Sequence, residues 1–269
     1  MSGKLLIVGD SFCTYYIEEN RKHRNSGKNK PYIFEIKPFK YWFEYLGKEL
    51  NLEIVNYAEC GSGNQQIFDN TLYALNKHSD IKFAVVCWSG FDRIDLPRFD
   101  ELYCTHINLT DTLEFVHNDI SKTYNPLFRR DEVFNVKSMI NKFINYSITL
   151  DSLFKCKDIK LLQAFSIEPY LKGSNEDRLE EGEVYRYYIN HRFFDKINEK
   201  QFFEFPGTKV LGGKNLYQLL GEYNHKDWKN NVINPMIDDK TDFIVDNHPN
   251  AKGNKIIFDA LYRFILDKY

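Results

Sequence analysis

The chain has 269 residues, with 36 Lys and Arg against 38 Asp and Glu, so its formal net charge is -2. That balance gives no general attraction to nucleic acid or to anionic membranes. Hydrophobic residues make up 43% of the chain and charged residues 28%, a globular composition rather than a disordered one.

Neither the start of the chain nor its cysteines indicate export. Met1–Lys4 runs directly into Leu5–Val8, without the longer apolar run and cleavage site of a secretory signal. Nowhere does the sequence approach the roughly 18 apolar residues of a membrane helix. The five cysteines include no C-x-x-C pair, which argues against a disulfide framework and a zinc ribbon. We therefore expect a cytoplasmic protein with reduced thiols, or one released by a non-classical route.

Short apolar runs alternate along the chain with segments of helical spacing. The predicted strands are residues 4–8, 52–58, 83–88 and 159–167. The predicted helices are residues 39–50, 64–77, 131–154 and 250–266. Strands that alternate with helices need crossover connections, which favours an α/β fold with a mainly parallel sheet.

Three segments do not follow this alternation. Residues 20–31 are polar and basic and are predicted to form a loop. Residues 93–130 and 170–245 are polar, aromatic and irregular. Because no Pro/Gly/Ser-rich linker borders either of the two longer segments, we interpret them as insertions in a single domain that spans residues 1–269.

A serine follows the first predicted strand directly, in the sequence Gly9-Asp10-Ser11-Phe12. Open α/β sheets place their ligands at the carboxyl ends of parallel strands, which is where Ser11 would lie. Glycine allows the chain to turn sharply there, although Gly-Asp-Ser also forms ordinary turns. Ser11 is therefore a candidate nucleophile.

An acidic residue and a histidine precede the last predicted helix, as Asp246-Asn247-His248-Pro249-Asn250. A serine hydroxyl becomes nucleophilic when an imidazole takes its proton and a carboxylate orients that imidazole. Asp246 and His248 can supply this pair from one loop. Asn250 is expected to cap the helix that follows.

A glycine-containing turn follows the second predicted strand, over residues 56–64. Acyl transfer requires hydrogen-bond donors aimed at a developing oxyanion, and such turns expose backbone N–H groups. Taken alone, the segment is better interpreted as a plain turn between a strand and a helix.

Together the three segments resemble the sequence blocks of the SGNH hydrolase superfamily, also called the GDSL esterase/lipase family. Gly9–Phe12 is similar to its first block, Gly61 matches the glycine of its second block, and Asp246 with His248 is similar to its last block. The resemblance spans residues 4 to about 266, with the insertions unmatched. It implies a flavodoxin-like three-layer α/β/α sandwich and metal-free hydrolysis or transfer of ester-linked acyl groups.

The chain departs from the family pattern after the third predicted strand. The family's third block is Gly-x-Asn-Asp, whose asparagine donates to the oxyanion, and Phe91 stands at that position. Losing one such donor costs about 2.7–4 kcal/mol in the transition state. Asn64, which follows Gly61 in the same turn region, is the expected replacement, and Ser89 and Arg93 are the alternatives.

The spacing of the last block also differs from the family pattern. One residue separates Asp246 from His248, where the family commonly has two. Asp246 is the expected carboxylate and Asp242 is the alternative.

Other conspicuous residues are assigned ordinary structural roles. The basic residues between Arg21 and Lys30 are interpreted as a solvated loop rather than a receptor for an anionic substrate. The aromatic residues of 185–194 are expected to pack within the second insertion rather than to form a sugar-binding wall. Cys13 is expected to be a small buried residue. The histidines show no ligand-like spacing, so we assign no metal and no cofactor.

The sequence therefore predicts a serine esterase with the triad Ser11, His248 and Asp246. Asp10, Ser89 and Arg93 are expected to contact the substrate, a small-molecule or glycan ester. An O-acetyl group on a carbohydrate is favoured over a long-chain lipid, because no amphipathic lid segment is evident.

No nucleic-acid partner and no membrane insertion are expected. The acceptor, water or a sugar hydroxyl, and the oligomeric state stay open. The alternative, which Phe91 and the short spacing of the last block favour, is an inactive glycan-binding or structural module with the same fold.

Overall fold

A computed structural model describes residues 3–18, 37–97, 104–108, 136–170, 180–221, 226–233 and 248–269. Its centre is a four-stranded sheet of β1 (Lys4–Val8), β2 (Glu53–Asn56), β3 (Ile81–Trp88) and β6 (Lys160–Phe165). The strand order is β2-β1-β3-β6 and every neighbouring pair is parallel. These are the first four positions of the flavodoxin-like order, which confirms the predicted fold class.

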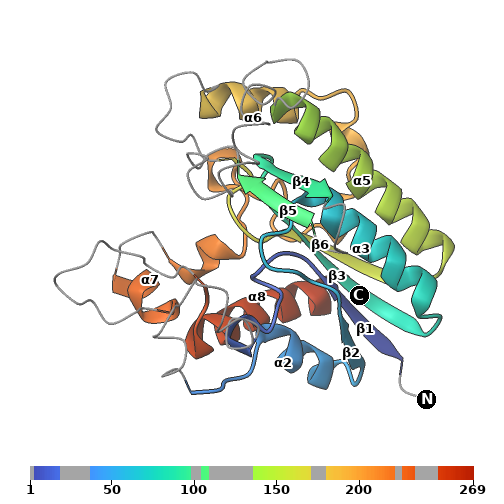
Figure 1. The fold of residues 1–269 in the computed structure, drawn as a ribbon, viewed down its shortest axis with the longest axis vertical. Helices are drawn as coiled ribbons and strands as arrows, with labels where there is room; N and C mark the ends of the chain where they lie inside the picture. Colours follow the sequence, from blue (N-terminus) through green and yellow to red (C-terminus); the bar gives the residue numbers. More distant parts are fainter. Residues whose placement is uncertain are drawn as a thin grey trace.

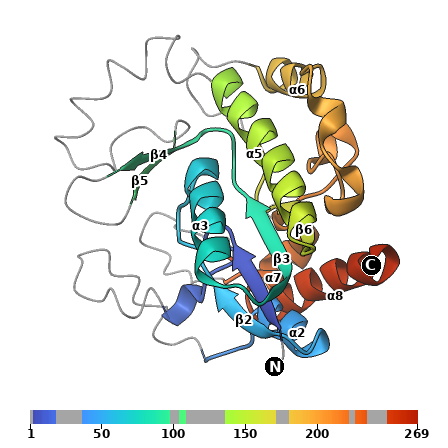
Figure 2. The same cartoon turned by 90° about the vertical axis from the view of Figure 1, so that its right-hand side faces the viewer.

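Helices cover both faces of this sheet (Figures 1 and 2). The helices α2 (Trp42–Glu49) and α8 (Ala251–Lys268) lie on one face, and α3 (Asn64–Lys77) and α5 (Val136–Cys156) lie on the other. Both faces of a parallel sheet are thereby removed from water, as the crossover connections require. The result is a three-layer α/β/α arrangement.

The central strand β1 shows why a continuous apolar run is needed in such a sheet. Leu5 and Ile7 point into the cluster under α2 and α8, whereas Leu6 and Val8 point into the cluster under α3 and α5. All four side chains are fully buried. Successive side chains of a strand face opposite sides, so a strand covered on both faces must be apolar at every position.

The first two predicted helices are present, and one of them begins later than predicted. The helix predicted over residues 64–77 is confirmed. The helix predicted over residues 39–50 begins only at Trp42, because Tyr41 is extended, with φ -81° and ψ 157°. The side chain of Glu44 accepts a hydrogen bond from the Tyr41 backbone N–H at 2.8 Å, which satisfies a donor at this helix start.

The last two predicted helices are also present. The helix predicted from residue 131 is described from Val136 onward, and residues 131–135 lie outside the described part of the chain. Asn250 caps α8 as predicted, because its Oδ1 accepts hydrogen bonds from the N–H groups of Lys252 and Gly253 at 2.9 and 3.0 Å.

The first predicted insertion contains a two-stranded antiparallel sheet of β4 (Arg93–Pro97) and β5 (Cys104–Asn108). The sequence analysis did not predict these two strands of five residues each. Asp95 of β4 accepts hydrogen bonds from the N–H groups of Gly63 and Gln66, at 2.7 and 2.9 Å. A carboxylate from one element thus satisfies the free donors at the start of α3.

The second predicted insertion contains α6 (Glu181–Ile189) and α7 (Lys226–Asn231). Its short 3₁₀ helices are Phe194–Lys196, Glu199–Gln201, Lys209–Leu211 and Tyr217–Leu220. Tyr185 and Tyr188 are buried in the cluster under α3 and α5, which confirms the predicted core packing for these two rings. Phe193 is 37% exposed and does not follow that prediction.

Glu168, a buried carboxylate just after β6, binds several residues of the second insertion. It accepts hydrogen bonds from Tyr185 Oη at 2.5 Å, Asn215 Nδ2 at 2.9 Å, Gln218 Nε2 at 2.6 Å and the Thr208 hydroxyl. Burial raises the pKa of Tyr185, and the neighbouring carboxylate raises it further, so the Tyr185 hydroxyl stays a donor.

Among the described helices, none is both long and apolar enough to cross a membrane.

Candidate functional site

Ser11 lies in a tight turn directly after β1, at the carboxyl end of the sheet. The backbone N–H of Cys13 donates to the Asp10 carbonyl oxygen at 2.9 Å, and the N–H of Phe12 donates to Asp10 Oδ1 at 3.0 Å. From outside the turn, Trp42 Nε1 donates to the Phe12 carbonyl oxygen at 2.8 Å. These bonds hold the backbone around Ser11, whose own side chain is only partly buried.

Gly9 permits this turn for a steric reason. A Cβ atom at position 9 would lie 2.6 Å from Cys13 Sγ and 3.1 Å from Cys87 Cβ. Real side chains do not approach so closely, so any larger residue would displace the turn that presents Ser11. This agrees with the role that the sequence suggested for the glycine.

The loop after β2 lies alongside the Ser11 turn. The N–H of Glu59 donates to the Gly9 carbonyl oxygen at 3.1 Å, and Asn56 Nδ2 donates to the Cys13 carbonyl oxygen at 2.7 Å. Gly61 has a φ of 84°, a left-handed conformation that favours glycine. The second sequence block is therefore next to the first, as expected if both lie at one edge of a parallel sheet.

His248 meets Ser11 across 237 positions of sequence. Its Nε2 lies 2.6 Å from Ser11 Oγ. Two hydrogen bonds hold the backbone from His248 to Asn250 against the end of α7 and the residues that follow it. The Ile233 N–H donates to the His248 carbonyl oxygen at 2.7 Å, and the Asn250 N–H donates to the Asn231 carbonyl oxygen at 3.0 Å. The distance suits proton transfer from a hydroxyl to an imidazole.

Two aromatic rings flank the His248 imidazole. The ring of Tyr16 is stacked on it, with a centroid distance of 3.7 Å and an interplanar angle of 15°. Phe12 is tilted toward it at 5.5 Å. Sequence reasoning missed Tyr16, since no pattern in the sequence connects residue 16 with residue 248.

Asp10 directly precedes the candidate nucleophile Ser11, and its side chain is fully buried. Its Oδ2 accepts a hydrogen bond from Ser89 Oγ at 3.1 Å and forms an ion pair with Arg93 Nη1 at 3.2 Å. The three residues predicted to contact substrate thus contact one another. In this arrangement Asp10 and Arg93 join the Ser11 turn to the beginning of β4, and substrate contact stays a prediction.

The Asp10–Arg93 pair leads to a prediction about stability. Arg93→Gln removes the cation from a buried carboxylate that keeps only two neutral donors, so we expect a loss of about 1.5–3 kcal/mol in the free energy of unfolding. Thermal melts should show a fall in Tm of about 2–4 °C per kcal/mol. Lys137→Gln is the matched control, since its partner Glu183 is exposed and surface pairs contribute little. Equal Tm values for the two variants would contradict the structural role of Arg93.

Asn64, the first residue of α3, binds the backbone at the end of β3. Its Oδ1 accepts from the Ser89 N–H at 2.8 Å, and its Nδ2 lies 3.2 Å from the Ser89 carbonyl oxygen and 3.4 Å from that of Gly90. The side chain is 7% exposed. Asn64 is therefore not the cap of α3, and its predicted donation to an oxyanion stays a prediction.

The Phe91 side chain lies in the core rather than beside Ser11. Its ring is fully buried and contacts the rings of Phe143, Phe165 and Tyr188, with centroid distances of 5.3, 5.6 and 5.3 Å. The Phe91 N–H donates to the Pro169 carbonyl oxygen at 2.6 Å. Phe91, where the resemblance to SGNH hydrolases would place an asparagine, thus belongs to the core under α3 and α5.

Cys13 is the last candidate residue that the structure describes, and the others lie outside the described part of the chain. Cys13 is a free, fully buried thiol, as predicted. Burial, with contributions from Cys87 and Asp10, raises its pKa well above the usual value, which disfavours the nucleophilic thiolate. Asp246, its alternative Asp242 and the basic loop of residues 20–31 lie outside the described residues.

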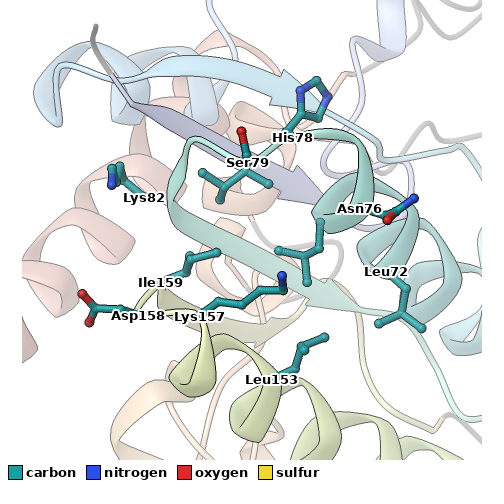
Figure 3. Close-up of a pocket in the computed structure, with 11 residues that line it drawn as sticks. Leu72, Asn76, His78, Ser79, Lys82, Leu153, Lys157, Asp158 and Ile159 are labelled. Atoms are coloured by element: carbon teal, nitrogen blue, oxygen red, sulfur yellow. The ribbon is translucent and has the colours of Figure 1, made fainter.

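A cavity of about 550 Å³ lies away from Ser11, where β3 begins and α3 and α5 end (Figure 3). Leu72, Leu153 and Ile159 line it together with His78 and Lys157. It contains none of the residues singled out above and is not part of the candidate site.

Comparisons with known proteins find similar solved structures but identify no family for this chain. No family model matches the sequence, and no curated protein is significantly similar to it. An α/β hydrolase from the metagenome of Lake Arreo, Spain, is similar in structure, with 13% identity, 97% of this chain and 94% of that chain covered, and a TM-score of 0.42.

Axe2, an acetylxylan esterase from Geobacillus stearothermophilus, is similar at 15% identity, 98% and 94% coverage and a TM-score of 0.41. Because both TM-scores are below 0.5, these likenesses carry no conclusion about activity. The candidate site therefore depends on its own geometry.

Proposed function

We propose that the protein is a serine esterase of the SGNH type that acts on short acyl esters, such as O-acetyl groups on a carbohydrate. The observation that supports this proposal is the 2.6 Å separation of Ser11 Oγ and His248 Nε2 at the carboxyl end of a parallel sheet. The two residues come from opposite ends of the chain, so local sequence does not explain their contact. A carboxylate from the last block, Asp246 or its alternative Asp242, would orient the imidazole.

The proposed reaction has two steps. In the first, the Ser11 hydroxyl proton passes to His248 Nε2 while Oγ bonds to the acyl carbon, and the carbonyl electron pair moves onto oxygen. As the ester C–O bond breaks, the leaving alkoxide takes the proton from His248 and departs as the alcohol. In the second, water attacks the acyl-serine, gives its proton to His248 and releases the acid, while Ser11 recovers its proton.

The developing oxyanion needs donors near Ser11. Within the described part of the chain, no hydrogen bond occupies the backbone N–H of Ser11 or of Gly61. We assign these two groups to the oxyanion. The Asn64 amide is the proposed side-chain donor, because the adjacent carbonyl oxygens of Ser89 and Gly90 can share one of its two N–H bonds and leave the other for substrate.

Labelling of Ser11 tests the proposal directly. A fluorophosphonate probe should modify the wild-type protein at Ser11, identified by mass spectrometry of the labelled peptide. Ser11→Ala should abolish this modification, whereas Ser152→Ala should retain it, because the Ser152 hydroxyl is exposed on α5 and donates to the Ile148 carbonyl oxygen. Absence of label on a folded wild-type protein would favour the second candidate, an inactive module. The observation that supports the second candidate is the burial of Phe91 at the position of a donor.

Asn64 provides a separate prediction about rate. Asn64→Ala is expected to lower kcat by roughly 10²–10³ and to leave KM nearly unchanged, since an oxyanion contact forms mainly in the transition state. It should also lower Tm, because the Ser89 N–H loses its buried acceptor. Kinetics with p-nitrophenyl acetate and a thermal melt of the same variant separate the two effects. A lower Tm with unchanged kcat would remove Asn64 from the oxyanion site.

A further inference from the structure

Tyr16 lies on the His248 imidazole in a geometry that nothing in the sequence motifs accounts for. The two rings are nearly parallel at 15°, with their centroids 3.7 Å apart. Tyr16 is only 5% exposed. The next residue, Ile17, donates its backbone N–H to Tyr41 Oη at 3.0 Å, which fastens the segment to the start of α2. The backbone next to Tyr16 is therefore held by a contact that does not involve His248.

This stack limits how the imidazole can turn. Rotation about the Cβ–Cγ bond would swing the His248 ring out of its plane and into the Tyr16 ring. Phe12, tilted toward the same imidazole at 5.5 Å, adds a second ring beside it. With the plane held, Nε2 stays directed at Ser11 Oγ, 2.6 Å away. A misplacement of a catalytic group by about 1 Å can lower the rate about 10²-fold, so the orientation of the base matters for turnover.

The same face also suits the charge that His248 would acquire. When the Ser11 proton arrives, the imidazole becomes an imidazolium cation. The face of an aromatic ring carries the negative part of its quadrupole, and it attracts a cation placed over it. A buried tyrosine stacked at 3.7 Å therefore favours the protonated ring more than an aliphatic side chain of similar size would.

We propose that Tyr16 is a positioning residue for His248, which holds the imidazole plane and favours the imidazolium formed during acyl transfer. The proposal rests on the proposed esterase function, and it depends on the ring face rather than on the phenol hydroxyl. It therefore separates two substitutions at one position. Tyr16→Phe keeps the face, and Tyr16→Leu removes it.

The experiment compares these variants with a neighbour as control. Tyr15 lies in the same segment and contacts the rings of Tyr41 and Phe43 instead of His248. With p-nitrophenyl acetate, we expect Tyr16→Leu to lower kcat about tenfold with KM changed by less than about twofold, an effect between those of an exposed and a fully desolvated cation–π contact. Tyr16→Phe and Tyr15→Leu should retain kcat within about threefold.

A spectroscopic readout checks the stack without requiring activity. The carbon-bound ring protons of His248 should resonate upfield in the wild type and in Tyr16→Phe, because they lie over an aromatic ring, and should move downfield in Tyr16→Leu. Tyr16→Met, which fills the same space without a ring, replaces Tyr16→Leu if the latter does not fold.

The outcomes are distinct. Wild-type kcat in a folded Tyr16→Leu protein that has lost the upfield shift would overturn the role of Tyr16 and leave the esterase proposal intact. A tenfold loss in Tyr16→Phe would assign the effect to the hydroxyl and would also overturn it. An unlabelled, inactive wild-type protein would overturn the esterase function and this role together, even if the upfield shift were present.

Discussion

His248→Gln is expected to lower kcat for p-nitrophenyl acetate by about 10⁴-fold or more, the effect of removing the base from a serine–histidine unit. The reason is the contact of 2.6 Å between His248 Nε2 and Ser11 Oγ. Glutamine can form hydrogen bonds at this position, but it cannot take a proton near neutral pH. The Ser11 hydroxyl would then have to attack without losing its proton, which makes it a poor nucleophile. Initial rates corrected for spontaneous hydrolysis measure the effect.

His191→Gln is the control for this substitution. His191 is followed by an exposed Arg192–Phe193 pair on the second insertion and has no contact with the Ser11 turn among the described residues. Its variant should keep kcat within about twofold. If His248→Gln retained more than a tenth of the wild-type kcat, His248 would not be the base, and the esterase mechanism proposed above would be wrong.

Phe91→Asn is expected to destabilise the protein by about 3–5 kcal/mol and to bring no gain in kcat. The substitution introduces the asparagine that SGNH hydrolases, which the sequence resembles, carry in their third block. In this structure, however, it removes a fully buried ring from contact with Phe143, Phe165 and Tyr188. Loss of a buried phenyl ring costs about 3–5 kcal/mol, and an amide buried among rings lacks partners and adds to that cost. Urea unfolding gives the free energy, and kinetics below the transition give kcat.

Phe91→Leu is the matched variant, because it keeps the position apolar and fills part of the same space. It should lose clearly less stability than Phe91→Asn, with kcat again unchanged. A Phe91→Asn protein that was as stable as the wild type and turned over faster would show that position 91 faces the oxyanion, contrary to the packing described here.

Much of the fold was determined by local sequence. The apolar run of β1 and the helical spacing of α3 predict their elements because burial on both faces of a sheet demands an unbroken apolar strand, and a helix against it demands an apolar stripe. Asn250 capped α8 as expected because capping involves only neighbouring backbone N–H groups. The β4–β5 pair was not predicted, because each strand has only five residues and the two pair with each other rather than with the central sheet.

Ser11 and His248 were likewise named as candidates from the sequence, by the chemistry of their residue types, by the strand and helix next to them and by the resemblance to the SGNH sequence blocks. Whether they meet depended on the whole sheet, since 237 positions separate them. Tertiary structure alone also decided that the Phe91 ring enters the core, that Asn64 binds Ser89 and Gly90, and that Tyr16 stacks on His248. The physical reason is the same in each case. A side chain's direction and partners are set by packing between distant segments, and a short motif contains no information about which distant segment will lie against it.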